Sequence, residues 1–230
     1  MVLGLNISII IPVYNESENI GAFLEYLPAL RDQCEIIFVD GGSSDDTVRQ
    51  IEGSGGTVLI SPDKGRANQM NYGASHANGD ILWFLHADSA PPKNALSLIR
   101  DVINKGYKAG CFPIRFDSRH PLMFIIAFLS NFLRVRIRNI AFGDQGIFIL
   151  RSLFQELGGY AVIPLMEDYQ LSLDVKKANL KFGMAKGKIV TSGRRYKMYG
   201  IVKTTRRMQI LQRKFRRGDD IEEIARMYDS

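Results

Sequence analysis

The chain has 230 residues, of which 46% are hydrophobic and 23% charged, and its formal net charge is +6 at pH 7. This length and composition are typical of a folded α/β domain with a full core, and they exclude an intrinsically disordered chain. The two cysteines, Cys34 and Cys111, lack the spacing of a zinc site or a disulfide framework, and such usage suits a reducing cytoplasm.

Charge is distributed unevenly along the chain. Residues 1–180 hold 16 Lys and Arg against 19 Asp and Glu, whereas residues 181–230 hold 14 against 5. The net charges of these two parts are therefore −3 and +9. The basic C-terminal end indicates an anionic partner, such as a diphosphate, lipid headgroups or nucleic acid.

Patterns over residues 1–90 alternate between strand and helix. Apolar runs at 8–11, 35–39, 57–60 and 81–85 predict buried strands, the first of them closed by Pro12. Helices are predicted over 19–30, over a segment carrying Val48 and Ile51, and over 65–77. This alternation predicts a mostly parallel sheet with helices on both faces, in which ligands bind at the carboxyl ends of the strands.

The second half of the chain is less regular. Strands are predicted over 110–116 and 145–150, and the apolar stretch 122–133 between them predicts a buried or interfacial helix. That stretch is shorter than the about 20 apolar residues of a membrane-spanning helix. Further helices are predicted after Ser152, over 168–178 and from Ile201 to Phe215. The N-terminus has no signal-peptide pattern.

Polar residues follow each of the first four predicted strands, and four such clusters at one sheet edge indicate a binding site. Asp40 directly follows a buried run, where a carboxylate needs partners. It either binds a ligand or caps the loop that contains Ser43. His86 and Asp88 follow the fourth strand and are groups that bind metals or move protons.

These segments together resemble the family 2 glycosyltransferases, which have the GT-A nucleotide-diphospho-sugar transferase fold. The resemblance rests on SIIIPVYNESENI at 8–20, IIFVDGGSSDDT at 36–47, GRANQMNYGASHANGDILWFLHADS at 65–89 and LMEDYQLS at 165–172. GDQGIF at 143–148 and TSGRRY at 191–196 add a likeness to small, single-domain bacterial members. The resemblance implies one domain over 1–230, with a nucleotide-binding half (1–90), an acceptor and catalytic half (91–198) and basic C-terminal helices (199–230).

The resemblance also implies roles for individual residues. Nucleotide contacts are expected from the loop at 14–16 and specifically from Pro12, Tyr14, Glu16, Asp40, Gly41, Arg66, Ala87 and Asp88. Asp88 matches the last acid of the Asp-x-Asp motif, which implies a divalent cation such as Mn²⁺ or Mg²⁺. His86 departs from that motif and is expected as a metal ligand, as a donor that orients the metal site, or as a hydrogen-bonded histidine near the core.

The same reasoning extends to the reaction. Asp168 is expected to be the general base, with Glu167 orienting either Asp168 or the acceptor, and Asp144 is the next candidate for the base. Asp168 could equally cap the helix that follows it. Arg194 and Arg195 either close over the diphosphate or are simply solvated. A single base candidate favours inversion, because a retaining double displacement needs a second carboxylate as nucleophile.

The sequence therefore predicts a metal-dependent, inverting glycosyltransferase that uses a UDP- or GDP-sugar and an acceptor hydroxyl on a small or lipid-linked molecule. The alternatives are a nucleotidyltransferase, whose Gly-rich N-terminal loop is missing, and a non-catalytic nucleotide-sugar-binding protein. A cytoplasmic location is expected, with no nucleic-acid partner, because few aromatics lie between the basic residues.

Peripheral contact with anionic membranes is a further expectation for the last long helix. Its basic residues lie opposite an apolar face formed by Ile201, Met208, Leu211 and Phe215. The competing interpretation is that this apolar face packs on the domain and that the charges face water.

Overall fold

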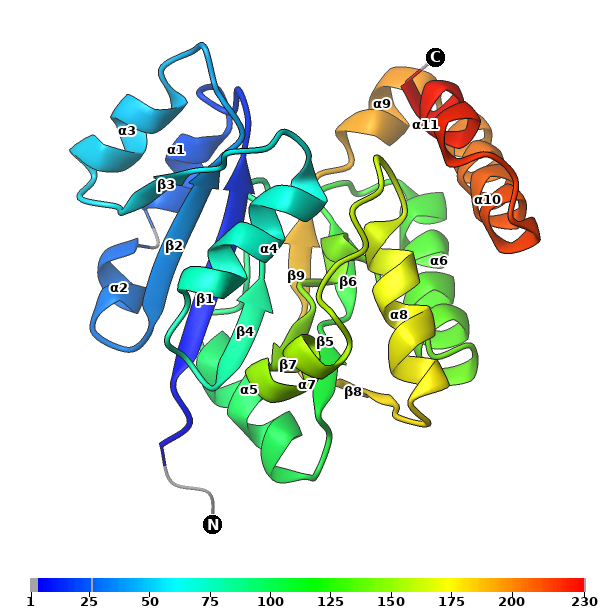
Figure 1. The fold of residues 1–230 in the computed structure, drawn as a ribbon. Helices are drawn as coiled ribbons and strands as arrows, with labels where there is room; N and C mark the ends of the chain where they lie inside the picture. The colour runs from blue at the N-terminus through cyan, green and yellow to red at the C-terminus, as the bar shows by residue number, and fades with distance from the viewer. Residues whose placement is uncertain (1–3, 26, 230) are drawn as a thin grey trace.

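The computed structural model describes residues 4–25 and 27–229 (Figure 1). Within them the chain forms a seven-stranded sheet and a separate two-stranded sheet, with helices around both. The strands are β1 (Ile7–Val13), β2 (Glu35–Asp40), β3 (Val58–Ile60), β4 (Ile81–Phe84), β5 (Ala109–Cys111), β6 (Ile114–Phe116), β7 (Phe148–Leu150), β8 (Phe182–Met184) and β9 (Ile189–Thr191).

The helices fall into three groups along the chain. The first group is α1 (Ile20–Leu24), α2 (Leu27–Arg31), α3 (Thr47–Gly53), α4 (Arg66–His76) and α5 (Ala95–Asn104). The second is α6 (Pro121–Leu129), the π-helix η1 (Ser130–Ile137), the 3₁₀ turn η2 (Gly143–Gln145), α7 (Arg151–Glu156) and α8 (Glu167–Lys177). The last is α9 (Arg194–Tyr199), α10 (Ile201–Arg217) and α11 (Ile221–Asp229).

The large sheet has the strand order β3-β2-β1-β4-β7-β5-β8. The first four neighbours are parallel, β7 is antiparallel to β4 and β5, and β8 is parallel to β5. The prediction of a mostly parallel sheet flanked by helices is confirmed. Because β1, β2 and β4 run the same way, their carboxyl ends meet at one edge, where polar loops follow each of them.

Side chains alternate between the two faces of the large sheet and build a core on each. One face carries Ile9 and Trp83, which pack with apolar residues of α1, α2 and α5. The other face carries Ile10 and Phe84, which pack with α4, α7 and α8. Figure 1 shows α4, α7 and α8 in front of the sheet, and the sheet is therefore covered on both faces, as an apolar parallel sheet requires.

Prolines account for three differences from the predicted elements. Pro12 does not close β1, which continues to Val13, because β4 pairs only with residues 7–10 and leaves Pro12 on a free edge. The helix predicted over 19–30 is two helices, since Pro28 cannot donate to the carbonyl of Leu24. The strand predicted over 110–116 divides at Pro113 into β5 and β6, which belong to different sheets.

The apolar side of α10 packs on the protein. Leu211 is fully buried, and Met208 and Phe215 join it in a cluster with Tyr169 of α8 and Ile224 of α11. The interpretation that this face packs on the domain is therefore confirmed, and the face is not available for membrane contact. Among the described residues no helix combines the length and the apolar character that crossing a membrane requires.

A single buried glutamine joins α4 to two strands. The Gln69 side-chain amide donates hydrogen bonds to the carbonyl oxygens of Val13 (2.8 Å) and Val39 (2.7 Å), at the carboxyl ends of β1 and β2. A Cβ at Gly41 would lie 3.0 Å from the Gln69 side chain, so glycine leaves the room that this amide needs. Gln69 thus fixes the edge of the sheet from which the polar loops extend.

We expect Gln69→Met to lower the free energy of unfolding by about 1–3 kcal/mol, because it removes the donor from two buried carbonyl groups. Urea denaturation would show a lower midpoint at an unchanged slope. Ser75→Ala, at an exposed position of the same helix, should stay within about 0.5 kcal/mol of wild type. Equal midpoints for Gln69→Met and wild type would show that the amide does not stabilise this junction.

Candidate active site

The loops after β1 and β2 are held together by hydrogen bonds. The Asn15 amide donates to Ser43 Oγ (2.9 Å), and Asn15 Oδ1 accepts from the Ser44 amide (2.9 Å). The Glu16 amide donates to Thr47 Oγ1 (2.8 Å). Asn15 has a φ of 50°, a left-handed conformation that asparagine tolerates. The two loops therefore form one preformed surface at the edge of the sheet.

Asp40 organises its own loop. Its side chain is buried, and Oδ2 accepts hydrogen bonds from the amides of Gly42 (2.8 Å) and Ser43 (2.9 Å). Oδ1 accepts from the Ser43 hydroxyl (2.5 Å). The capping interpretation of Asp40 thus has direct geometric support, and these bonds meet the requirement of a buried carboxylate for partners.

The other residues expected around the nucleotide lie along the same edge. Tyr14 is 53% exposed, and its ring is accessible to a ligand. The Glu16 carboxylate accepts a hydrogen bond from the Asn19 amide group (2.9 Å). Pro12 lies within β1, and Ala87 is buried directly after β4. Their roles toward a nucleotide stay predictions.

An ion pair connects the two halves of the chain. Arg66 begins α4 and Glu167 begins α8, 101 residues later, and Arg66 Nε donates to Glu167 Oε1 at 2.5 Å. The Glu167 side chain is 2% exposed, whereas that of Arg66 is 39% exposed. Burial alone would lower the pKa of Arg66, but the charges of Glu167 and Asp168 raise it, so the guanidinium stays protonated.

Asp168 lies in the first turn of α8. Its Oδ2 accepts from the Gly143 amide (2.7 Å) and its Oδ1 from the Tyr169 amide (2.7 Å). The expectation that Asp168 caps this helix is wrong: Met166 occupies the N-cap, with a φ of 68°. Burial, and then the charge of Glu167, raise the pKa of Asp168 to about 6, against the opposing effect of Arg66.

A cavity of about 430 Å³ brings most of the expected catalytic and metal-binding residues together. Arg66, His86, Asp88, Asp144, Asp168, Arg194 and Arg195 line it. Its other walls come from α6, η1, α10 and α11. Tyr14 and Asp40 do not line it. The site therefore has a preformed loop surface on one side and a partly enclosed cavity on the other.

Asp88 and Asp144, which we call the acidic pair, both line this cavity. Burial raises the pKa of Asp88, although Arg194 and Arg66 oppose the shift. Burial also raises the pKa of Asp144, Arg134 opposes this, and Asp88 raises it further. Asp144 Oδ1 is buried and has no hydrogen-bond partner. Two carboxyl groups whose charges repel each other, with one oxygen unpartnered, are the kind of environment that a cation stabilises.

The protein side chains alone do not provide a complete set of ligands for a divalent cation. Within residues 4–25 and 27–229, no three His, Cys, Asp or Glu side chains lie together as a metal-binding group. Mg²⁺ is commonly bound through one or two carboxylates together with substrate phosphates. Asp88, with Asp144 nearby, fits that kind of site, in which a diphosphate supplies the remaining oxygens.

His86 is only partly exposed. Burial lowers the pKa of His86 to about 3, and the nearby charge of Arg66 lowers it further, so the imidazole is neutral at neutral pH. A Cβ at Gly143 would lie 2.6 Å from His86 Nε2, and only glycine leaves this space open. A neutral imidazole is the form that binds metals. The three roles expected for His86 all stay open to test.

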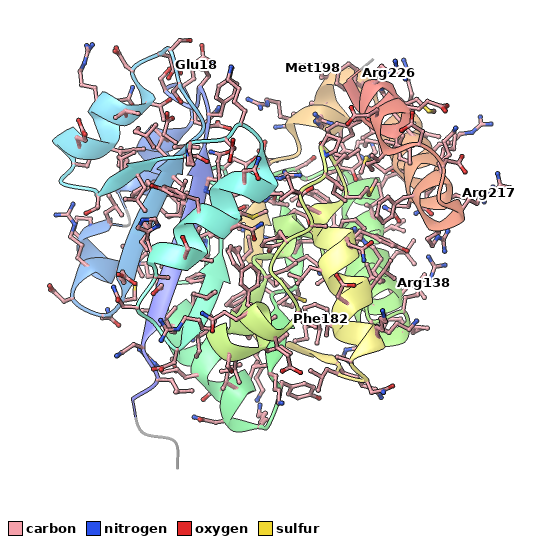
Figure 2. The ribbon with its side chains drawn as sticks, viewed as in Figure 1. Glu18, Arg138, Phe182, Met198, Arg217 and Arg226 are labelled. Atoms are coloured by element: carbon pink, nitrogen blue, oxygen red, sulfur yellow. The ribbon has the colours of Figure 1, made fainter. Side chains whose placement is uncertain are left out.

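The two arginines at the start of α9 have different surroundings. Arg194 lines the cavity, and its charge acts on Asp88. The Arg195 guanidinium lies 3.8 Å from the centre of the Tyr228 ring in α11, a cation–π contact. Figure 2 labels Met198 of α9 and Arg226 of α11 in the upper part of the molecule. Arg194 is therefore the better placed of the two to meet a diphosphate.

Sequence reasoning missed several residues of this site. Gly143 donates to Asp168 and leaves space for His86, but a lone glycine in GDQG carries no signal of either contact. Gln69 resembled an ordinary polar residue of a helix. Tyr228 lies 140 residues after Asp88 in the chain and reaches the cavity only because α11 folds back on α10.

The raised pKa of Asp168 predicts a pH-dependent stability. The unfolded carboxyl has an ordinary pKa of 3.8, so the folded chain binds this proton more tightly and loses stability as pH rises from about 4 to 6. Asp168→Asn removes that loss. The free energy of unfolding of the variant, relative to wild type, should therefore rise by roughly 2 kcal/mol between about pH 4 and pH 7. Urea denaturation at both pH values measures this difference, and a constant difference would contradict the assignment.

Sequence relatives were found for parts of the chain. Residues 8–156 match the model of the family described as glycosyl transferase family 2. An uncharacterised glycosyltransferase of Mycobacterium tuberculosis is 45% identical over 60 residues, which are 25% of this chain and 23% of the relative. The undecaprenyl-phosphate 4-deoxy-4-formamido-L-arabinose transferase of Klebsiella pneumoniae is 32% identical over 112 residues, which are 44% of this chain and 34% of that protein.

Solved structures share the fold. A mannosyltransferase from Pyrobaculum calidifontis, in complex with GDP-Man and Mn²⁺, has a TM-score of 0.64 at 21% identity, over 82% of this chain and 57% of the other. Glucosyl-3-phosphoglycerate synthase from Mycobacterium tuberculosis, in complex with Mg²⁺ and UDP, has a TM-score of 0.58 at 18% identity, over 82% and 70%. Because the family model matches more than half of its residues, this chain belongs to glycosyl transferase family 2.

Proposed function

We propose that this protein transfers a sugar from a nucleotide-diphospho-sugar to an acceptor hydroxyl, with the help of a divalent cation and with inversion. The observation that carries the proposal is one cavity that holds a carboxyl of raised pKa, Asp168, together with the acidic pair of Asp88 and Asp144. Family membership and neighbours solved with GDP-Man and Mn²⁺ or with UDP and Mg²⁺ support the donor class.

The donor would bind across the carboxyl ends of β1, β2 and β4. Residues 1–90 supply the preformed loop surface, on which the exposed Tyr14 ring is free to contact a base. The diphosphate would extend toward Arg194 and the partly exposed Arg66. Arginine suits this role because its planar guanidinium matches phosphate oxygens. UDP and GDP donors are both compatible with these features.

A divalent cation held by Asp88 and the diphosphate would supply charge neutralisation as the diphosphate leaves. The chain's own residues would do the remaining work around this position. Asp144 would add negative charge on the same side of the cavity, and the neutral His86 would bind or orient without adding charge. Arg194, whose charge acts on Asp88, would hold the departing diphosphate.

Asp168 would accept the proton of the acceptor hydroxyl. As the new bond forms between the acceptor oxygen and the anomeric carbon, the bond from that carbon to the diphosphate breaks, and the proton moves to the Asp168 carboxylate. A base is most effective when its pKa lies near the working pH, and a pKa of about 6 meets this condition. With Glu167 paired to Arg66 and with Asp88 and Asp144 assigned to the cation, Asp168 is the carboxylate left to act on the acceptor, which favours inversion.

The acceptor half would be residues 91–198 together with the C-terminal helices. The cavity wall formed by α6 and η1 is largely apolar, with Ile126, Leu129 and Leu133, and α10 contributes Thr205 and Gln209 to the lining. Such a wall suits an acceptor with an apolar part. The Klebsiella relative is named for undecaprenyl phosphate, which makes a lipid-linked acceptor one of the two classes to test, beside small molecules.

Asp88→Ala should abolish the gain in nucleoside-diphosphate affinity that Mn²⁺ provides to wild type, because the cation loses its protein ligand. Isothermal titration of UDP and GDP, with and without Mn²⁺, measures this gain. Asp101→Ala, an exposed acid on α5, is the matched control and should behave as wild type. If Asp88→Ala keeps the full Mn²⁺ dependence, Asp88 does not hold the cation. His86→Ala should have a smaller effect, about 10–100-fold if it orients the site.

Asp168→Asn should lower kcat by about 10²–10⁴-fold while donor affinity stays near wild type, because only proton acceptance is lost. Glu167→Gln should cost less, and Asp174→Asn, on the same helix outside the cavity, should cost nothing. Wild-type kcat should rise with pH through about 6, where Asp168 loses its proton. If Glu167→Gln is inactive and Asp168→Asn is active, Glu167 is the general base and Asp168 the orienting residue. Full activity in both would move the base elsewhere, with Asp144 the next residue to replace.

A further inference from the structure

Helices α6 and η1 expose a continuous stripe of large apolar side chains, which we call the α6–η1 face. Its members are Leu122, Phe124, Ile125, Phe128, Leu129, Phe132, Leu133 and Ile137. They recur three to four residues apart, whereas Met123, Ala127 and Val135 on the other side are buried in the protein. Phe124 is 56% exposed and Phe128 is 65% exposed. In Figure 1, α6 lies at the margin of the molecule, away from the large sheet.

This exposure is unusual because the fold buries apolar faces elsewhere. The apolar side of α10 is packed against α8 and α11, and both faces of the large sheet are covered. On the α6–η1 face, by contrast, the rings of Phe128 and Phe132 stack with their centroids 5.9 Å apart, and both side chains remain exposed to solvent. Contiguous apolar surface of this kind marks a site of interaction with a protein or a membrane.

Basic residues lie at both ends of the α6–η1 face. Arg119 precedes α6, Arg136 lies in η1 and Arg138 follows it, and all three are exposed. Residues 118–143 contain no Asp or Glu. Figure 2 shows Arg138 at the outer margin of the molecule. A second copy docked symmetrically on this face would bring these like charges close together, whereas an anionic bilayer would attract all of them.

We propose that the α6–η1 face docks on an anionic membrane. The exposed aromatic and aliphatic side chains would enter the boundary between headgroups and acyl chains, and Arg119, Arg136 and Arg138 would meet the lipid phosphates. The sequence placed possible membrane contact on the apolar face of α10, but that face packs on the domain, and the proposal concerns a different surface. Membrane docking by this face does not depend on the proposed function.

The cavity and the α6–η1 face share residues. Leu129 and Leu133 belong both to the α6–η1 face and to the cavity wall, and Arg134 and Arg138 also line the cavity. A lipid-linked acceptor could therefore place its polar head near Asp168 while its chain stays in the bilayer. This consequence, unlike docking itself, rests on the proposed function.

Vesicle flotation tests the proposal. Wild type should float with vesicles of phosphatidylcholine and phosphatidylglycerol, less with phosphatidylcholine alone, and less at high salt. The double variant Phe124→Gln/Phe128→Gln should partition about tenfold more weakly or worse, because two rings no longer enter the bilayer. Arg119→Gln/Arg136→Gln should lose the preference for phosphatidylglycerol. Val162→Gln, an exposed apolar residue on another part of the chain, is the matched control.

Docking on a membrane would be contradicted if wild type does not float with the vesicles, or if the double phenylalanine variant floats as well as wild type. Sedimentation adds a further check: a wild-type dimer that the double variant dissociates, together with no binding of wild type to vesicles, would also contradict it. The last result would make a second copy the partner. Far-ultraviolet circular dichroism checks that each variant is folded. Neither phenylalanine lines the cavity, so Mn²⁺-dependent nucleotide binding should persist in the variant. Loss of flotation with nucleotide binding intact therefore separates this proposal from the proposed function.

Discussion

The ion pair between Arg66 and Glu167 is the interaction on which the candidate active site depends. It joins the first residue of α4 to the first residue of α8, and so connects two helices of one sheet face that lie far apart in the chain. Because Glu167 is almost fully buried, its charge needs this partner, and removing Arg66 would leave an uncompensated carboxylate in the core. The pair also adjusts the pKa of Asp168, which burial raises first: Glu167 raises this pKa further, and Arg66 lowers it.

The candidate site combines a hydrogen-bonded loop surface, the proposed donor side, with a cavity, the proposed acceptor side. The loops after β1 and β2 are tied together by Asn15, Asp40 and Ser43, and Gln69 holds the strand ends beneath them. Across the edge of the sheet, the cavity is walled by α6, η1 and α10, which present both apolar side chains and arginines. This division explains how one chain could fix a nucleotide and still admit an acceptor of mixed character.

Much of the fold followed from periodic patterns, whereas the contacts that define the site did not. Apolar runs such as 81–85 identified the parallel strands, and an acid after such a run identified Asp40, Asp88 and the edge of the sheet. The pattern could not tell that Asp40 is used by its own loop, because that depends on backbone amides two and three residues away. Nor could it tell which apolar helix face is covered: α10 is amphipathic and basic, α6 is almost uniformly apolar, and only tertiary packing buries the apolar side of α10 and leaves one side of α6 exposed.

The central claim is that burial raises the proton affinity of Asp168 and that Glu167 and Arg66 adjust it in opposite directions, and a direct titration of that carboxyl group tests it. Carbon-13 NMR of selectively labelled aspartate, with Asp168→Asn to assign the signal, would follow its ionisation. The account predicts a midpoint near pH 6 in wild type and a higher midpoint in Arg66→Met, where the repulsion from Glu167 is unopposed. A midpoint near the ordinary value of 3.8, unchanged by Arg66→Met, would contradict the account.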